Sequence, residues 1–219
     1  MARGRDSRTE LLDATRAALA TEGANSVQLK YICEKLGIAP SLVNYYFGSA
    51  EKLMAEASVV SYEEYVDLNK AAVASAGEDP EARLRAWIQS QMTWTIAHPG
   101  IAAILNYGLA NPNVGSAMSD DLAARIHKAS TRNTLLATTL VRDFINGRYS
   151  PERLTSEEVG PSLVLDSTMV VMWMTLGVST WAAGQHLPTR QYQTAFAENS
   201  ITDRAIDQLL ALVKTLRTK

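Results

Sequence analysis

The chain has 219 residues, of which 47% are hydrophobic, so it is long enough to bury a full core in one or two domains. Its formal net charge of −2 excludes a uniformly basic protein that coats nucleic acid. A single cysteine excludes an internal disulfide and fits a reducing compartment. Glycine and proline are few, and apolar residues recur at helical spacing, so an all-α fold is predicted.

The first predicted helix carries apolar residues at helical spacing from Leu11 to Leu19. Glu22-Gly23 marks its expected end. Three basic residues, Arg3, Arg5 and Arg8, precede this first predicted helix. A basic arm of this kind can follow phosphates or enter a minor groove, although an ordinary solvated N-terminus explains the same residues.

The stretch over residues 26–53 predicts two short helices joined by a glycine turn. The apolar residues between Leu29 and Leu36 share one helical face, and Gly37 stands where a left-handed residue would end that helix. Ile38 is expected to plug the turn, and Pro40 to open the second helix. This spacing is that of a helix-turn-helix that reads DNA.

The second short helix has an apolar face and a polar face. Val43 and Phe47, four residues apart, form the apolar face. The opposite face offers hydroxyl and amide groups, which reach phosphate oxygens, and asparagine can bridge an adenine edge. The residues expected to point outward are Ser41, Leu42, Asn44, Tyr45 and Tyr46.

The order and spacing of these motifs resemble the N-terminal domain of TetR-family transcriptional regulators. The resemblance covers residues 8 to 56 and includes Leu36-Gly37-Ile38, Asn44-Tyr45-Tyr46-Phe47 and Ser49-Ala50-Glu51-Lys52-Leu53. The family usually has threonine where Val27 stands, alanine where Cys33 stands and lysine where Ala50 stands. The last difference removes a phosphate-neutralising charge.

The resemblance implies a DNA-binding domain over residues 1–50 and a helical regulatory and dimerisation domain over residues 51–219. Lys52 is expected to substitute for the lysine that is usual at position 50. Tyr46 is expected to bond a phosphate and Lys30 to reach a base edge. The candidate DNA-binding residues are Arg3, Arg5, Gln28, Lys30, Pro40, Ser41, Leu42, Asn44, Tyr45, Tyr46 and Lys52.

The rest of the chain is predicted to be helical, with breaks at sequences rich in proline, glycine and asparagine. A polar stretch over 146–161 predicts a long loop. The predicted helices cover 51–76, 80–97, 101–109, 114–145, 163–185 and 202–216.

The predicted helix over 163–185 lies in a stretch without Asp, Glu, Lys or Arg from Ser167 to Thr189. That length could span a bilayer, but hydroxyl residues interrupt it and no basic flank bounds it, so a buried helix is favoured. Together with the apolar stripe over 202–216, it predicts a four-helix interface between two copies, that is, a homodimer. The N-terminus lacks an apolar run, so no signal peptide is predicted and a cytoplasmic location is expected.

Tryptophan and methionine on three of these helices predict a small-molecule pocket. Aromatic and thioether surface with isolated polar groups is the mix that such pockets use, whereas plain core packing is the alternative. The candidate ligand-binding residues are Trp87, Gln91, Trp94, Asn106, Tyr107, Thr134, Thr138, Met169, Met172 and Trp173.

The sequence contains no catalytic, metal or cofactor motif: His98, His127 and His186 are scattered, and Cys33 reads as a small buried hydrophobe. The favoured function is a dimeric repressor, released from a palindromic DNA operator by a small, mostly apolar ligand. The alternative is a helical binding or carrier protein without operator function, and a more distant one is a helical enzyme that acts on the ligand.

Overall fold

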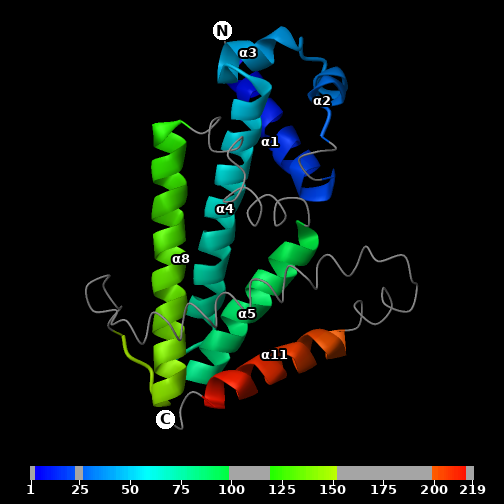
Figure 1. The fold of residues 1–219 in the computed structure, drawn as a ribbon. Helices are drawn as coiled ribbons and strands as arrows, with labels where there is room; N and C mark the ends of the chain where they lie inside the picture. The colour runs from blue at the N-terminus through cyan, green and yellow to red at the C-terminus, as the bar shows by residue number, and fades with distance from the viewer. Residues whose placement is uncertain (1–2, 23–26, 99–118, 152–198, 216–219) are drawn as a thin grey trace. The chain divides into compact units, whose positions relative to one another are not determined.

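The computed structural model describes residues 3–22, 27–98, 119–151 and 199–215. Within these ranges the chain forms helices and turns without any strand, as predicted. The helices are α1 (Arg3–Glu22), α2 (Leu29–Leu36), α3 (Ser41–Phe47), α4 (Ala50–Ser75), α5 (Pro80–Ala97), α8 (Asp120–Asn146) and α11 (Asn199–Thr215) (Figure 1).

The bounds of α4 and α5 agree with the prediction to within one residue, because both helices end at strong local signals. Gly77, with φ of 75°, follows α4, and the Asp79 carboxylate accepts the Ala82 N–H at 2.7 Å at the start of α5. None of the described helices is long and apolar enough to cross a membrane. The predicted helices over 101–109 and 163–185 lie outside the described residues.

Three predicted boundaries are wrong, and one of them is the start of α11, which lies at Asn199 and not at residue 202. Helix α1 already begins at Arg3, so Arg3, Arg5 and Arg8 lie in its first turns and not in an arm before it. Helix α8 begins at Asp120 and not at residue 114, because the Ser119 hydroxyl accepts the Leu122 N–H at 3.4 Å and caps the helix. Acidic residues in the first turn of α8 then complement the helix dipole.

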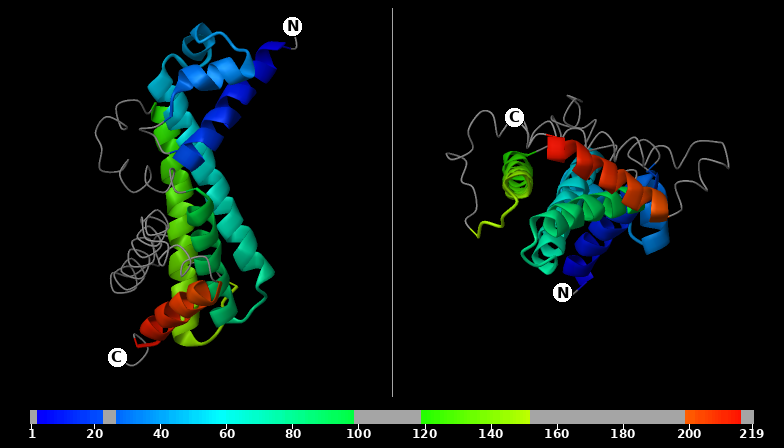
Figure 2. Two further views of the ribbon diagram at one scale, coloured as in Figure 1. Left: turned by 90° about the vertical axis from the view of Figure 1, so that its right-hand side faces the viewer. Right: turned by 90° about the horizontal axis from the view of Figure 1, so that it is seen from below.

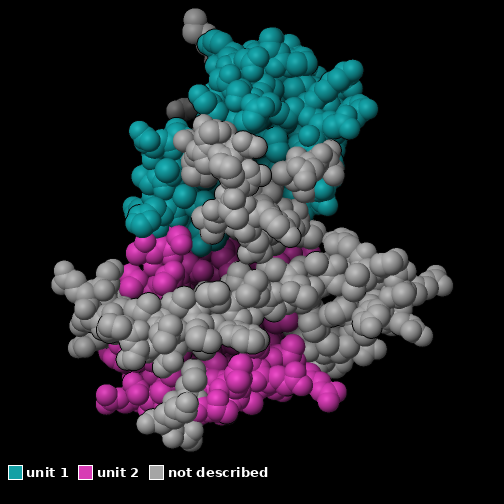
Figure 3. All heavy atoms as spheres, in the orientation of Figure 1, with its two compact units in different colours: residues 1–64, 97–129 teal, residues 65–96, 130–219 magenta. Residues whose placement is uncertain are grey.

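The chain divides into two compact units, Met1–Glu64 with Ala97–Ala129, and Tyr65–Ile96 with Ser130–Lys219 (Figure 3). In the first unit, helices α1, α2 and α3 pack with the start of α4 around one apolar cluster (Figure 1). Burial of these side chains is the main source of stability in so small a group of helices. The fully buried members are Leu11, Cys33, Val43, Phe47 and Leu53.

The first turns of α8 also belong to this unit. Leu122 packs against Ala55 and Val59 of α4. Arg125 donates to the two carboxylate oxygens of Glu63 at 3.1 and 2.6 Å. The hydrogen bonds to Glu63 raise the pKa of Arg125.

The second unit is built around a larger apolar core shared by α5, α8 and α11. Figure 2 shows α11 lying beside α5 in both views, and Asp207 and Lys214 of α11 form ion pairs with Arg85 and Glu81 of α5 at 2.5 and 3.0 Å. Exposed pairs of this kind contribute little, so the core holds α11 in place. Its buried residues include Leu84, Trp87, Ile88, Leu140, Phe144, Ile206, Leu210 and Val213.

Candidate nucleic-acid interface

The turn between α2 and α3 is fixed by backbone hydrogen bonds. Gly37 has φ of 65° and ψ of 28°, the left-handed conformation that favours glycine. Its N–H donates to the Glu34 carbonyl at 3.2 Å, and the Ile38 N–H donates to the Cys33 carbonyl at 2.9 Å. This is a Schellman motif, completed by Ile38 packing on the core that contains Cys33. The predicted roles of Gly37 and Ile38 are confirmed.

Helix α3 starts immediately after Pro40, whose φ of −55° and ψ of −27° are already helical. Val43 and Phe47 are buried in the core and hold one side of the helix. The short helix is therefore positioned by its apolar face, as the spacing predicted.

The polar face of α3 divides into exposed and half-buried residues. Ser41, Asn44 and Tyr45 are exposed, and Tyr45 keeps 79% of its surface accessible. Leu42 and Tyr46 are half-buried, and Tyr46 packs against the core, so the expectation that both point fully outward is wrong. The Tyr46 ring meets the Tyr45 ring edge to face, with 5.0 Å between the ring centres.

Helix α2 adds a second exposed surface. Gln28 and Lys30 are exposed, and the Lys30 ammonium lies 3.8 Å from the Glu34 carboxylate one turn along the helix. Tyr31 is 62% exposed and was not among the predicted site residues. Its position off the apolar face of α2 was visible in the sequence and could have identified it. An exposed tyrosine of this kind can donate to phosphate.

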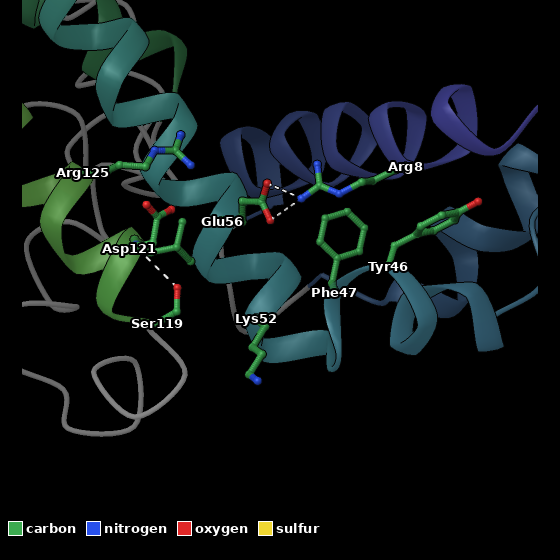
Figure 4. A pocket seen from close by; sticks show the side chains of 9 residues that line it. Arg8, Tyr46, Phe47, Lys52, Glu56, Ser119, Asp121 and Arg125 are labelled. Carbon is green, nitrogen blue, oxygen red and sulfur yellow. Dashed lines mark hydrogen bonds and ion pairs between the residues drawn. The ribbon is translucent and has the colours of Figure 1, made fainter. Parts of the chain in front are cut away.

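Arg8 connects three helices of the first unit (Figure 4). From α1, it donates to the two carboxylate oxygens of Glu56 on α4 at 2.7 and 2.8 Å. Its guanidinium carbon also lies 4.7 Å from the centre of the Phe47 ring, at the end of α3. A planar guanidinium suits both contacts at once, so Arg8 fixes α3 relative to α1 and α4.

The start of α4 is capped by Ser49, whose hydroxyl accepts the Lys52 N–H at 3.2 Å. Glu51 lies in the first turn, where backbone and Ser49 hydrogen bonds lower the pKa of its carboxyl group. Lys52 is exposed, and its ammonium has no acidic partner among the residues the structure describes. Lys52 therefore offers an unpaired positive charge close to the end of α3.

A polar cavity of about 450 Å³ lies beside the end of α3 (Figure 4). The Arg8–Glu56 pair and Lys52 line one part of it, and Asp121 and Arg125 of α8 line another. The two arginines that line this cavity are already paired, Arg8 with Glu56 and Arg125 with Glu63, so the lining suits ion pairing between helices more than capture of an apolar ligand.

The interior of the second unit contains buried polar side chains among aromatic rings. The Tyr65 hydroxyl donates to the Gln91 carbonyl oxygen at 2.5 Å, and the Tyr65 ring lies 4.7 Å from the Trp94 ring. Among the described residues, Gln91 Nε2 and Trp87 Nε1 are buried donors without any acceptor. An unsatisfied buried donor costs about 1 to 3 kcal/mol, so each such group calls for an explanation.

A second polar pair lies in the same unit. Asn69 of α4 donates to the side-chain oxygen of Asn133 on α8 at 3.4 Å, and the Asn69 oxygen has no donor within the described part of the chain. Tyr65, Asn69 and Asn133 were not predicted. Tyr65 and Asn69 are one turn apart on α4, but only their burial marks them as interior groups.

The predicted ligand residues fall into three groups. Trp87, Gln91 and Trp94 are buried on α5, and Thr138 is buried on α8, where its hydroxyl donates to the Thr134 carbonyl at 2.9 Å. Thr134 itself is exposed, so its side chain is not brought together with the others. The remaining predicted residues, Asn106, Tyr107, Met169, Met172 and Trp173, lie outside the described residues.

Comparison with known proteins agrees with this geometry. Residues 11–57 match the model for bacterial regulatory proteins of the tetR family. No curated protein matches the chain at a significant level.

Three solved structures share the fold at 16% sequence identity. A regulatory protein of the tetR family from Rhodococcus RHA1 has a TM-score of 0.62, and the match covers 94% of this chain and 96% of that one. The TetR-family transcriptional regulator PfmR from Thermus thermophilus has a TM-score of 0.60, with 92% and 97% covered. A tetR-family transcriptional regulator from Streptomyces coelicolor has a TM-score of 0.61, with 95% and 88% covered. Residues 11–57 therefore match the tetR family of bacterial regulatory proteins, and the chain shares the fold of these three regulators.

Proposed function

We propose that this DNA-binding regulator is a homodimeric repressor, released from a palindromic operator by a small, mostly apolar ligand. The observation that carries the proposal is the pair of unsatisfied buried donors on α5, Trp87 Nε1 and Gln91 Nε2, in an aromatic interior. A ligand with one or two acceptor atoms would satisfy them, which explains why the chain keeps polar groups there.

The proposed contacts with DNA follow from the exposed surface of the helix-turn-helix. Ser41, Asn44 and Tyr45 of α3 would enter the major groove, with Asn44 suited to an adenine edge. Lys30 would reach a base edge from α2, and Lys52 would neutralise a phosphate. A carrier protein without operator function would gain nothing from leaving these groups exposed, which favours the regulator over that alternative.

Two-fold symmetry would place one reading helix in each of two successive major grooves. Half-sites about 10 base pairs apart, or a multiple of that spacing, would then match the two copies. Ligand binding would stabilise an arrangement in which the reading helices no longer match this spacing. Operator affinity would fall by the difference in ligand affinity between the two states.

Selection of duplexes from a random-sequence pool tests the operator part of the proposal. The expected product is a site with two inverted half-sites that binds two or more chains in even number, measured by sedimentation of the complex. A selected site without internal symmetry, or one that binds a single chain, would contradict the proposed dimeric repressor.

Release by 1-naphthol, a neutral aromatic alcohol, tests the ligand part. We expect 1-naphthol to lower operator affinity of the natural chain, and Gln91→Leu to weaken that response about fivefold through the loss of one hydrogen bond. Gln89→Leu is the matched control, because Gln89 is exposed on the same helix. Equal responses of the two variants would remove Gln91 from the ligand site, and no release from any of the three proteins would contradict the proposed ligand class.

A further inference from the structure

A second cavity in the second unit is lined by neither Trp87 nor Gln91. It is a groove of about 330 Å³ between the C-terminal halves of α4 and α8, closed at one end by residues 149–151. This volume lies at the small end of the range for ligand sites.

The floor of this groove is apolar. Val66 and Val73 are buried on α4, and Leu135 and Leu136 are half-buried on α8. Val66 and Val73 lie two helical turns apart on one wall, and Leu135 and Leu136 line the other, so an extended hydrocarbon chain could lie between the two helices. The floor alone would suit any small apolar molecule.

The rim of the groove is positively charged. Arg83 donates to the carbonyl oxygens of Gly77 and Val73 at 2.8 and 3.4 Å, and its guanidinium stacks on the Tyr149 ring at 4.6 Å. This cation is therefore held in place by neutral groups, which leave its charge uncompensated.

Two further cations complete the rim. Arg132 is paired with Asp67 at 2.5 Å, whereas Lys70 is exposed and has no acidic partner in the described ranges. Asp67 is the one carboxylate paired with these three cations among the described residues, so the rim carries a local excess of positive charge. An anionic group at the mouth would be attracted to it.

We propose that this groove binds an amphipathic monocarboxylate, such as a medium-chain fatty acid. The hydrocarbon chain lies on the floor made by Val66, Val73, Leu135 and Leu136, and the carboxylate lies at Lys70. Lys70 is the partner of the carboxylate because its ammonium makes no ion pair with the described residues. Arg83 is bonded to the Gly77 carbonyl and Arg132 to Asp67, so these two arginines attract the carboxylate through their charge alone. The proposal does not rest on the proposed release by a neutral ligand, since it uses other residues.

Calorimetric titration of the full chain with decanoate, compared with decanol, tests this site. Decanoate is expected to bind more tightly than decanol, and the difference should shrink as salt is added. Lys70→Gln should weaken decanoate binding about two- to fivefold, the range for one exposed charge, and leave decanol unchanged.

A groove-filling variant locates the site. Ala74→Phe places a ring at the edge of the groove and should abolish decanoate binding. Ala71→Phe is the matched control, because Ala71 is also an exposed alanine of α4 but does not line the groove. Unchanged decanoate binding by Ala74→Phe, equal loss in both variants, or no binding to the natural chain would each overturn the proposal.

Discussion

Arg8 illustrates how one side chain can position α3, the proposed reading helix, through contacts within the protein. One guanidinium nitrogen donates to both carboxylate oxygens of Glu56, and the planar group also stacks on Phe47, a stacking that the lysine ammonium cannot reproduce. We expect Arg8→Lys to cost about 1 kcal/mol of stability, since the pair is partly exposed, and to lower affinity for all DNA sequences alike. Thermal unfolding and operator titration measure the two effects.

The salt dependence of binding separates positioning from phosphate contact. Arg8→Ala should leave the slope of log K against log salt unchanged, because Arg8 is already paired within the protein. Lys52→Ala is the comparison, and its slope should fall by about one because an unpaired charge is lost. If Arg8→Ala reduced the slope as Lys52→Ala does, Arg8 would be a phosphate contact.

Tyr46 and Lys30 are expected to act differently on DNA. Tyr46→Phe removes a hydroxyl but keeps the ring that packs on the core, so it should weaken binding to every duplex equally. Lys30→Gln should instead reduce the preference for the operator over a duplex changed at one base pair. Titration of both variants against these duplexes measures the difference, and unchanged affinity and preference in both would remove α2 and α3 from the proposed interface.

At the scale of the element, α4 begins directly after α3, and its first turn depends on the Ser49 cap. Ser49→Ala removes the acceptor for the Lys52 N–H and should cost about 1 kcal/mol of stability. Ser49→Asp keeps an acceptor and is the matched control. Chemical denaturation measures both, and equal stability of Ser49→Ala and the natural chain would show that water replaces the hydroxyl.

The hydrogen bonds at this cap also make the stability of the folded chain depend on pH at acidic values. Hydrogen bonds lower the pKa of Glu51 in the folded chain, so its contribution is fully present above its unfolded pKa of about 4.3. That contribution is lost as pH falls through the lower folded pKa. Glu51→Gln should therefore lose less stability than the natural chain between neutral pH and strongly acidic pH, and identical pH profiles would contradict the assignment.

The elements that were predicted well are those whose signals are local. Gly37, Pro40 and the periodic apolar residues determine α2 and α3 within a few positions of the chain. The start of α1 was missed because its helical state is supported by Arg8 bonding Glu56, which is 48 positions away. The half-burial of Tyr46 was missed because it also depends on residues distant in the sequence. Tyr46 packs on a core shared by several helices, and the spacing of residues within α3 cannot predict that packing.

The interior of the second unit was predicted only in part, because the sequence shows contacts within one helix but not contacts between helices. Trp87, Gln91 and Trp94 share one face of α5, which their spacing shows. Tyr65 meets Gln91 only through the packing of α4 on α5, and its sequence neighbours read as an ordinary apolar face. Hydrogen bonds between polar groups on different helices can therefore be identified only from the tertiary structure.

At the scale of the whole molecule, α11 is the described helix on which the proposed dimer depends. Val213 is 2% exposed in a single chain and belongs to the core with α5 and α8, so it does not lie at a seam between copies. Leu212, the next residue toward the N-terminus, is 52% exposed. A large exposed apolar residue on this helix is the better candidate for contact with a second copy.

Charges at these two adjacent positions should consequently have opposite effects. Val213→Asp buries an unpaired carboxylate within one chain and should unfold the second unit, measured as loss of helical signal. Leu212→Asp should leave each chain folded and shift sedimentation from dimer to monomer, with weaker operator binding because the two reading helices are no longer linked. If Leu212→Asp remains a dimer with full operator affinity, the exposed face of α11 does not form the seam, and a natural chain that sediments as a monomer at micromolar concentration would remove the dimer altogether.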